Sequence, residues 1–118
     1  MNMQKLMDEI AEWSDKTFGT RQRNPAILYH LKKEVPELIQ AIKKFQKENE
    51  LDKAIKNIKN VKSEYADCMM LLLDSAYHFG LTAEKLFLAT KEKLEINKKR
   101  KWGKPDKNGV VEHVKECK

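Results

Sequence analysis

Apolar residues recur at every third or fourth position along most of the chain, which is the period of an α-helix rather than of a β-strand. The first such segment begins at Met3 and ends before Gly19. Asn24 followed by Pro25 is a combination that starts helices, and the apolar positions after it continue to the polar cluster 47–52. The pattern therefore predicts two helices, the second of them long, with a turn after it.

The helical pattern resumes beyond this turn and continues to Phe79, where Gly80 is a favourable C-terminal stop. Thr82 can cap a fourth helix, which ends before Trp102. Apart from the valines at 110–114, no segment alternates long enough to indicate a strand. We therefore expect an all-α protein, a four-helix bundle built around an antiparallel helical hairpin, with an irregular C-terminal tail.

Length and composition fit one modest globular domain over residues 1–118, of which 41% are hydrophobic and 36% charged. The longest uninterrupted apolar run, 68–73, is too short to cross a membrane, and the N-terminus lacks the pattern of a signal peptide. Two cysteines, Cys68 and Cys117, build neither a disulfide framework nor a Cys-based zinc site. A reducing, cytoplasmic setting and no membrane partner are expected.

The positive charge is concentrated in the tail. Residues 98–118 hold eight Lys and Arg against three acidic residues and so carry most of the formal net charge of +6, whereas residues 1–97 are nearly neutral. A chain whose whole surface is basic suggests binding to nucleic acid, but a short basic tail does so only weakly. A small helical nucleic-acid-binding or interaction protein that uses this tail is the alternative to the enzyme derived below.

Acidic residues spaced three apart are the candidate functional residues. Their Cβ atoms lie about 5–6 Å apart on a helix, so their carboxylates can share a cation. The chain has five such pairs: Glu9/Glu12, Glu12/Asp15, Glu34/Glu37, Glu64/Asp67 and Glu92/Glu95. The Glu34/Glu37 and Glu64/Asp67 pairs are equidistant in sequence from the middle of the predicted turn. An antiparallel hairpin therefore brings these four carboxylates level with each other.

The apolar run that follows Asp67 predicts partial burial of these acids, since a helix that is apolar all round is covered all round. Met69 and Met70 in this run are most simply core residues. Carboxylates crowded in a low dielectric repel each other unless cations neutralise them, and an oxygen-only ligand set suits Mg²⁺ or Mn²⁺ better than zinc. The alternative is an acidic hairpin in solvent, with three lysines as counter-ions: Lys32, Lys33 and Lys62.

The two acid motifs, Glu34-x-x-Glu37 and Glu64-x-x-Asp67, resemble the signature of the all-α nucleoside triphosphate pyrophosphohydrolases, the MazG-like superfamily. Four further segments are similar in order and spacing to its small dATP/dGTP-type branch: Trp13 with Thr17-Phe18-Gly19, His30-Leu31-x-Lys33-Glu34, Ala66-Asp67 with Asp74, and Lys93-x-x-x-Asn97-x-x-Arg100-x-Trp102. Lys33 departs from the pattern, because MazG itself usually has the first of two adjacent glutamates there. Pro36 lies between the first two acids and predicts a local kink.

The resemblance implies hydrolysis of a nucleoside triphosphate, such as dATP or dGTP, to the monophosphate and pyrophosphate. It assigns Mg²⁺, with Mn²⁺ as a substitute, to four catalytic carboxylates: Glu34, Glu37, Glu64 and Asp67. Any one of these can accept the proton of the attacking water.

Substrate binding is expected along one face of the fourth helix, where Lys93, Asn97 and Arg100 follow each other at i, i+4 and i+7. His30, one turn before Glu34, can face the substrate site or a carboxylate, and Trp102 can stack on a base or cover the bundle. Trp13 and Phe18 are core or pocket wall, and the buried position of Asp74 requires a partner that the sequence does not identify. The excess of apolar surface on the third helix predicts a homo-oligomer, at least a dimer.

Overall fold

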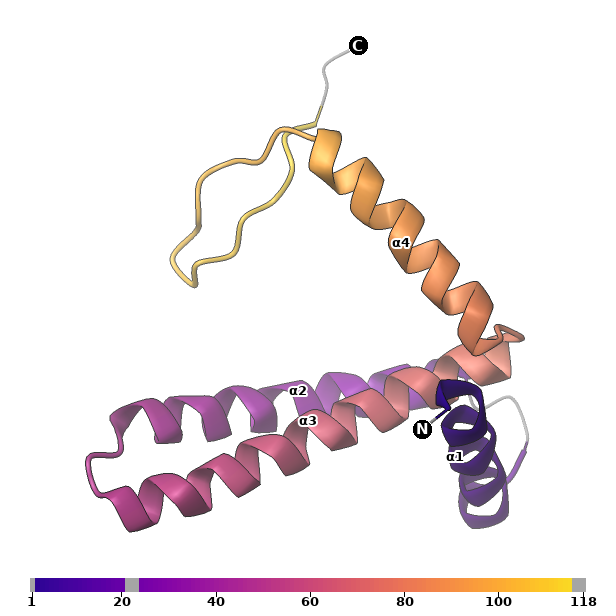
Figure 1. Cartoon of the computed structure of the whole chain (residues 1–118), viewed down its shortest axis with the longest axis horizontal. Helices are drawn as coiled ribbons and strands as arrows, with labels where there is room; N and C mark the ends of the chain where they lie inside the picture. The colour runs from indigo at the N-terminus through magenta and orange to yellow at the C-terminus, as the bar shows by residue number, and fades with distance from the viewer. Residues whose placement is uncertain (1, 21–23, 116–118) are drawn as a thin grey trace. The chain divides into compact units, whose positions relative to one another are not determined.

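The structure is a computed structural model that describes residues 2–20 and 24–115. The described residues form four helices: α1 (Met3–Phe18), α2 (Asn24–Lys47), α3 (Leu51–Phe79) and α4 (Ala83–Lys99) (Figure 1). The predicted all-α class and the four helices are confirmed. No described helix is both long enough and apolar enough to span a bilayer. The expectation for Cys117 lies outside the described residues.

Local capping interactions explain where α1 begins and where α3 ends. The Asn2 side chain accepts hydrogen bonds from the backbone N–H groups of Gln4 and Lys5, which satisfies two donors in the first turn of α1. Gly80 ends α3 in the left-handed conformation (φ 103°), and its N–H donates to the carbonyl of Tyr77. The predicted stop at Gly80 is confirmed.

The start of α2 differs in detail from the prediction. Asn24 is the first helical residue rather than a residue that precedes the helix, and its side-chain oxygen accepts a hydrogen bond from the Ser75 hydroxyl on α3. Asn24 therefore ties the beginning of α2 to the end of α3. Pro36 lies inside α2, and the helix continues through it to Lys47.

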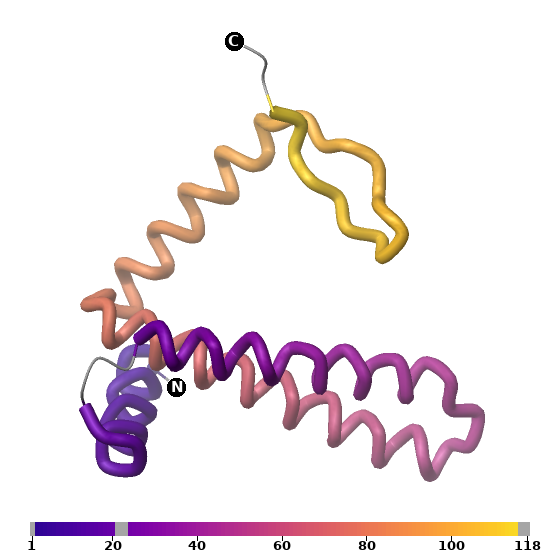
Figure 2. Tube along the Cα trace, turned by 180° about the vertical axis from the view of Figure 1, so that it is seen from behind, coloured from indigo at the N-terminus to yellow at the C-terminus, as the bar shows by residue number. Residues whose placement is uncertain are grey.

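The chain divides into two compact units, Met1–Ala83 and Glu84–Lys118, so the single domain over 1–118 stays a prediction. In the first unit α2 and α3 form the predicted antiparallel hairpin, and α1 packs against α3 (Figures 1 and 2). The buried apolar side chains of this unit are few: Met7, Ile10, Ala11, Ile27 and Leu73. They place the core where α1 meets the beginning of α2 and the end of α3.

In the second unit the chain turns back after α4. Trp102 and His113 form an isolated antiparallel bridge, and their rings pack edge to face with centroids 6.0 Å apart. Beside this bridge the N–H of Gly103 donates to the carbonyl of Glu112 at 2.8 Å. The tail is therefore irregular, but residues 102–103 are held to residues 112–113 by these contacts.

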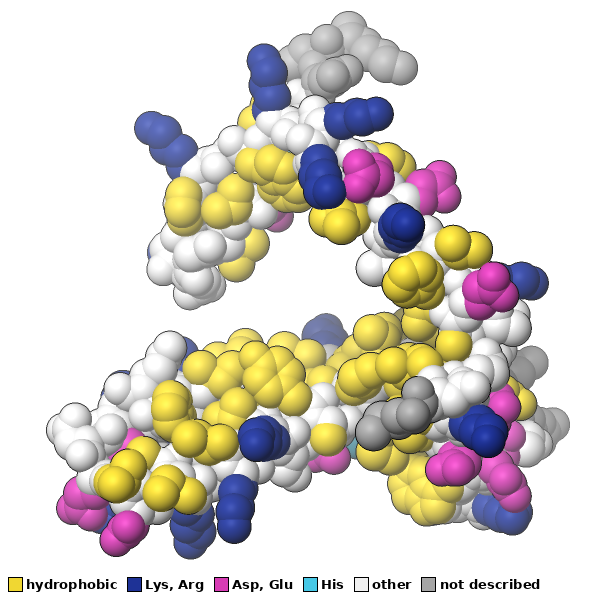
Figure 3. All heavy atoms as spheres, viewed as in Figure 1, with side chains coloured by type: hydrophobic (Ala, Val, Ile, Leu, Met, Phe, Trp, Pro, Cys, Tyr) yellow, Lys and Arg dark blue, Asp and Glu magenta, His cyan; other side chains and the backbone are white. Residues whose placement is uncertain are grey.

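The burial expected for the apolar run of α3 is wrong for most of its side chains. Leu73 is 4% exposed, but Met69 is 45%, Met70 37% and Leu72 50% exposed. The reason is that α1 and α2 cover only part of the circumference of α3, so the remaining face meets solvent. Figure 3 shows hydrophobic side chains gathered over the hairpin.

Candidate metal and nucleotide site

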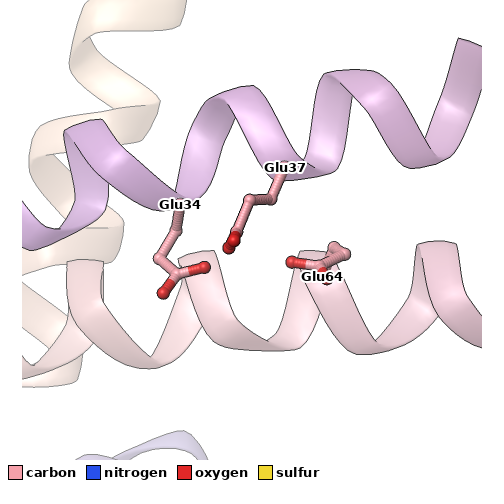
Figure 4. Close-up of side chains that lie close together, drawn as sticks. All are labelled: Glu34, Glu37 and Glu64. Carbon is pink, nitrogen blue, oxygen red and sulfur yellow. The ribbon is translucent and has the colours of Figure 1, made fainter.

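Three carboxylates meet across the hairpin: Glu34 and Glu37 from α2, and Glu64 from α3 (Figure 4). One oxygen of each lies within 4.8 Å of the others. The register follows from the antiparallel pairing, because the two acid motifs are equally far from the turn. The structure thus brings together three of the four predicted metal ligands.

These carboxylates stand in an unfavourable electrostatic environment. A hydrogen bond with Glu37, burial and the charge of Glu37 all raise the pKa of Glu34, and the nearby His30 opposes this only in part. One oxygen of Glu64, Oε2, is buried without a hydrogen-bond partner. A buried carboxylate oxygen without a donor is costly, and a cation satisfies it. The all-oxygen donor set therefore fits a hard divalent ion such as Mg²⁺.

Asp67 lies outside this three-residue cluster, and because its side chain is exposed, the burial expected for it is wrong. Burial raises the pKa of the Cys68 thiol, and the charges of four carboxylates raise it further: Glu34, Asp67, Glu64 and Glu37. All four predicted acids are therefore close enough to Cys68 to act on its thiol. Asp67 as a fourth ligand stays a prediction.

A pocket of about 460 Å³ adjoins the carboxylates in the first unit. It is lined by Ile10, Trp13, Phe18, Ala26, Ile27, His30, Glu34, Asp67, Met70, Leu71 and Asp74. The Trp13 and Phe18 rings are both exposed and pack edge to face, with centroids 5.4 Å apart. Of the two expectations for these aromatic residues, core or pocket wall, the structure supports the wall.

His30 also belongs to this lining, and its contact with a substrate stays a prediction. Its Nε2 lies 3.2 Å from Oε1 of Glu34, one helical turn further along α2. The imidazole can therefore hold the Glu34 carboxylate in place and still meet a ligand in the pocket.

Asp74, whose partner the sequence left open, lies on the pocket wall and is only 3% exposed. Its Oδ1 accepts a hydrogen bond from the Ser14 hydroxyl at 2.9 Å and lies 3.1 Å from Nδ1 of His78. The other ring nitrogen of His78, Nε2, lies 2.7 Å from Oδ1 of Asp15. We call these four residues, Ser14, Asp15, Asp74 and His78, the clasp, because they join α1 to α3.

Sequence reasoning missed Ser14, Asp15 and His78. The one local signal was the spacing of Asp74 and His78, which are four residues apart and thus neighbours on one helix face. The two α1 residues carry no such signal, because they lie about sixty positions away in the sequence.

The predicted phosphate-binding residues lie in the second unit. Lys93 and Asn97 line a shallow depression on α4. The expected place of Arg100 on the same helix face is wrong, because α4 ends at Lys99. The Asn97 side chain accepts a hydrogen bond from Nη1 of Arg100 at 3.1 Å, and its backbone carbonyl accepts one from the Trp102 indole at 3.0 Å. The structure thus links Asn97, Arg100 and Trp102 to each other, and their contact with a substrate stays a prediction.

Both helices of the hairpin present carboxylates to one point. This arrangement is typical of the all-α proteins with a carboxylate metal site. A model of the dATP/dGTP pyrophosphohydrolase family matches residues 41–118, which is most of the chain, and the protein belongs to this family. The matched segment contains Glu64, Asp67 and residues 93–102, whereas Glu34 and Glu37 precede it.

One relative is the Eaa protein of Salmonella phage P22, which is 42% identical over 53 residues. The match covers 45% of this chain and 17% of that protein, so the chain spans about a sixth of the relative's length. No solved structure matches the chain.

Proposed function

We propose that this protein is a Mg²⁺-dependent pyrophosphohydrolase that converts dATP or dGTP to the monophosphate and pyrophosphate, with Mn²⁺ as a substitute metal. The observation that carries this proposal is the convergence of Glu34, Glu37 and Glu64, together with a buried oxygen of Glu64 that has no hydrogen-bond partner. An aromatic-walled pocket beside these carboxylates supports it. The family to which the chain belongs supports the reaction class.

The proposed catalytic roles belong to the acids of the two motifs. Glu34, Glu37, Glu64 and Asp67 would hold the metal, which supplies neutralisation of the polyphosphate charge and a more acidic water. One carboxylate accepts the proton of the attacking water. The water oxygen bonds to phosphorus, the bridge between the α- and β-phosphates breaks, and pyrophosphate leaves.

The nucleoside is proposed to lie in the pocket, where Trp13 and Phe18 offer apolar ring surface for stacking. His30 lies beside Glu34 and can contact the sugar or a phosphate. Lys93, Asn97 and Arg100 of the second unit are proposed to bind the polyphosphate, with Trp102 as a further contact to the substrate.

The test is release of pyrophosphate from a panel of nucleoside triphosphates, with Mg²⁺, with Mn²⁺ and with a chelator. Turnover of dATP or dGTP that needs the metal is expected. If no triphosphate is cleaved with either metal, the enzyme assignment is overturned.

A homo-oligomer is proposed from the exposed apolar face of the hairpin. At about 100° per residue, the exposed apolar residues of α3 lie within a narrow arc roughly opposite Asp67: Ile58, Tyr65, Met69 and Leu72. Those of α2 continue this face: Leu28, Val35 and Ile39. A contiguous apolar surface of this kind is typical of an interface. A second copy of the chain is the occupant, since the same face on another hairpin is equally apolar.

Light scattering at micromolar concentration should give at least the mass of a dimer. The Tyr65→Glu variant should shift the mass towards the monomer, because it places a charge within the apolar face. A wild-type chain that is monomeric under these conditions contradicts the proposal.

The free thiol of Cys68 is consistent with a reducing, cytoplasmic setting, which we also propose.

One observation favours a second candidate function. A groove of about 760 Å³ in the second unit has a strongly basic lining: Ile96, Lys99, Arg100, Lys101, His113, Val114 and Lys115. A nucleic acid would bind such a groove through its phosphates.

Two variants separate the candidates. If the enzyme assignment holds, Arg100→Ala should reduce kcat/KM by about tenfold to a hundredfold, the range for a hydrogen bond to a charged group. A paired change of Lys98 and Lys99 to Ala is the matched control and should reduce it far less. Equal losses in the two variants, together with nucleic-acid binding that weakens steeply with salt, would support the second candidate.

A further inference from the structure

We infer that His78 is a positioning residue for nucleotide binding: when its ring is protonated, the clasp holds the aromatic wall of the pocket, Trp13 and Phe18, against α3. A nucleotide then binds more tightly while the clasp is protonated than after it has lost its proton. This inference rests on the proposed function only in placing a nucleotide in the pocket.

The aromatic wall lies in the half of α1 that the clasp holds. Trp13 and Phe18 supply the ring surface of the pocket. The two clasp residues of α1 lie between them in the sequence and contact side chains of α3. The buried apolar residues of this helix all precede Trp13: Met7, Ile10 and Ala11. The clasp therefore attaches the second half of α1, which carries the wall, to α3.

The two ring nitrogens of His78 face acceptors on different helices. Nε2 lies 2.7 Å from Oδ1 of Asp15 on α1. Nδ1 lies 2.8 Å from the backbone carbonyl oxygen of Asp74 and 3.1 Å from its Oδ1, both on α3. A protonated imidazole donates from both nitrogens, whereas a neutral one donates from only one. Loss of the proton therefore removes one of the hydrogen bonds through which the ring joins α1 to α3.

The groups that face the ring favour its protonated form. Burial lowers the pKa of His78, but the hydrogen bonds to the Asp74 carbonyl and the Asp15 carboxylate, together with both acidic charges, raise it above its ordinary value. The Tyr77 ring packs edge to face against the imidazole, with centroids 5.4 Å apart. The clasp is therefore complete at mildly acidic pH and weakens as the pH rises through the folded-state pKa of His78.

The competing explanation is that the apolar contacts of α1 alone hold the aromatic wall and that His78 only stabilises the fold. Under that explanation, replacement of His78 changes nucleotide affinity by the same factor at every pH. A positioning role through the protonated ring changes it most at low pH.

The first experiment follows the aromatic wall without a nucleotide. In a Trp102→Phe background Trp13 is the one remaining tryptophan, so its fluorescence reports on the wall. Its emission should shift to longer wavelength between about pH 5.5 and about pH 9, because the released wall moves further into solvent. A further change of His78→Gln should remove most of this shift. Glu12→Gln is the matched control on α1 and should keep the shift, because it removes only an exposed ion pair with Lys16.

The second experiment is calorimetric titration of the full chain with the α,β-methylene analogues of dATP and dGTP, which resist hydrolysis, in the presence of Mg²⁺. The ratio of affinities between wild type and His78→Gln cancels the titration of the phosphates and of His30, which both proteins share. Wild type should bind at least about fivefold more tightly at about pH 5.5, and the ratio should approach one at about pH 9. Mn²⁺ alone should bind equally to both proteins, because the three-glutamate cluster lies on α2 and α3.

A third measurement needs no variant of His78 and decides the question if His78→Gln does not fold. If protonation of His78 favours nucleotide binding, a bound nucleotide must raise the pKa of His78, because the coupling is reciprocal. NMR titration of the three histidines, assigned with His30→Gln and His113→Gln, should show this rise on addition of the dATP or dGTP analogue.

An affinity ratio that is the same at every pH overturns the inference. A Trp13 emission that responds equally to pH with and without His78→Gln also overturns it, and so does a pKa of His78 that the nucleotide leaves unchanged. Absence of nucleotide binding by the wild type at every pH overturns it as well.

Release of pyrophosphate from dATP and dGTP distinguishes the two proposals. An affinity ratio that falls with rising pH, without release of pyrophosphate, would leave the inference standing and remove the proposed enzyme function. Release of pyrophosphate with an affinity ratio that does not change with pH would leave the enzyme function standing and remove the inference.

Discussion

The same face of α3 carries two groups of acidic side chains whose electrostatic environments are opposite. Near the middle of the helix, Glu64 meets Glu34 and Glu37, and burial and a neighbouring carboxylate raise the pKa of Glu34. Near its end, Asp74 and Asp15 flank the imidazole of His78. The three-glutamate cluster places carboxylates against one another, whereas the clasp places an imidazole between the carboxylates of Asp74 and Asp15.

This difference shows which group requires something from outside the chain. In the clasp each ring nitrogen of His78 faces an acceptor, so the imidazole bridges two carboxylates from within the protein. In the cluster the buried Oε2 of Glu64 has no partner. The clasp holds its acids with groups of the protein itself, whereas the crowded carboxylates of the cluster are suited to binding a cation.

The largest expected effect is on turnover, from Glu64→Gln. This change removes one ligand charge, so pyrophosphate release should fall by about a hundredfold or more. Thermal stability in the presence of a chelator should rise slightly, because fewer like charges crowd the empty cluster. Glu37→Gln and Asp67→Asn should behave similarly in the turnover assay. Full activity in Glu64→Gln would show that the cluster does not hold the catalytic metal.

Addition of Mg²⁺ should stabilise the wild-type fold and thereby sharpen the contrast between cluster and clasp. A ligand that binds only the folded state stabilises it by about 2.7 kcal/mol at a hundred times its Kd. Differential scanning calorimetry should therefore show a higher Tm with Mg²⁺ for the wild type and little change for Glu64→Gln. His78→Gln is the matched control and should keep the response to Mg²⁺, because it alters only the clasp.

The smallest effect concerns the stability of the clasp, and it depends on pH. Burial lowers the pKa of His78, but the hydrogen bonds to the Asp74 carbonyl and the Asp15 carboxylate, together with both acidic charges, outweigh it and raise the pKa above its ordinary value of 6.5. His78→Gln should therefore lower the free energy of unfolding by about 1–3 kcal/mol at pH 5.5.

The direction of the pH dependence follows from this raised pKa. The folded protein holds the His78 proton more tightly than the unfolded chain, so the stabilisation is complete below about pH 6.5 and is lost as pH rises through the folded-state pKa. Urea unfolding of wild type and His78→Gln at several pH values measures the difference. His30→Gln, whose side chain is half exposed, is the control. A gap between wild type and His78→Gln that widens above pH 7 would contradict the clasp as described.

Much of the architecture was predictable from the sequence, because helices depend on neighbours within one or two turns. Apolar periodicity indicated all four helices, and Gly80 ends α3 as expected. The equal distances of the two acid motifs from the turn also predicted the meeting of Glu34, Glu37 and Glu64. A hairpin with a short turn has its register set by that turn, so sequence distance translates directly into spatial position.

The tertiary structure alone decided the contacts that depend on how α1 packs against α3. Ser14 and Asp74 are 60 residues apart, and Asp15 and His78 are 63 apart, so no local pattern pairs them. The same packing decided that Met69 and Leu72 are exposed although their segment is apolar all round. Periodicity shows which residues share a helix face, but only the docking of the helices determines which faces are covered.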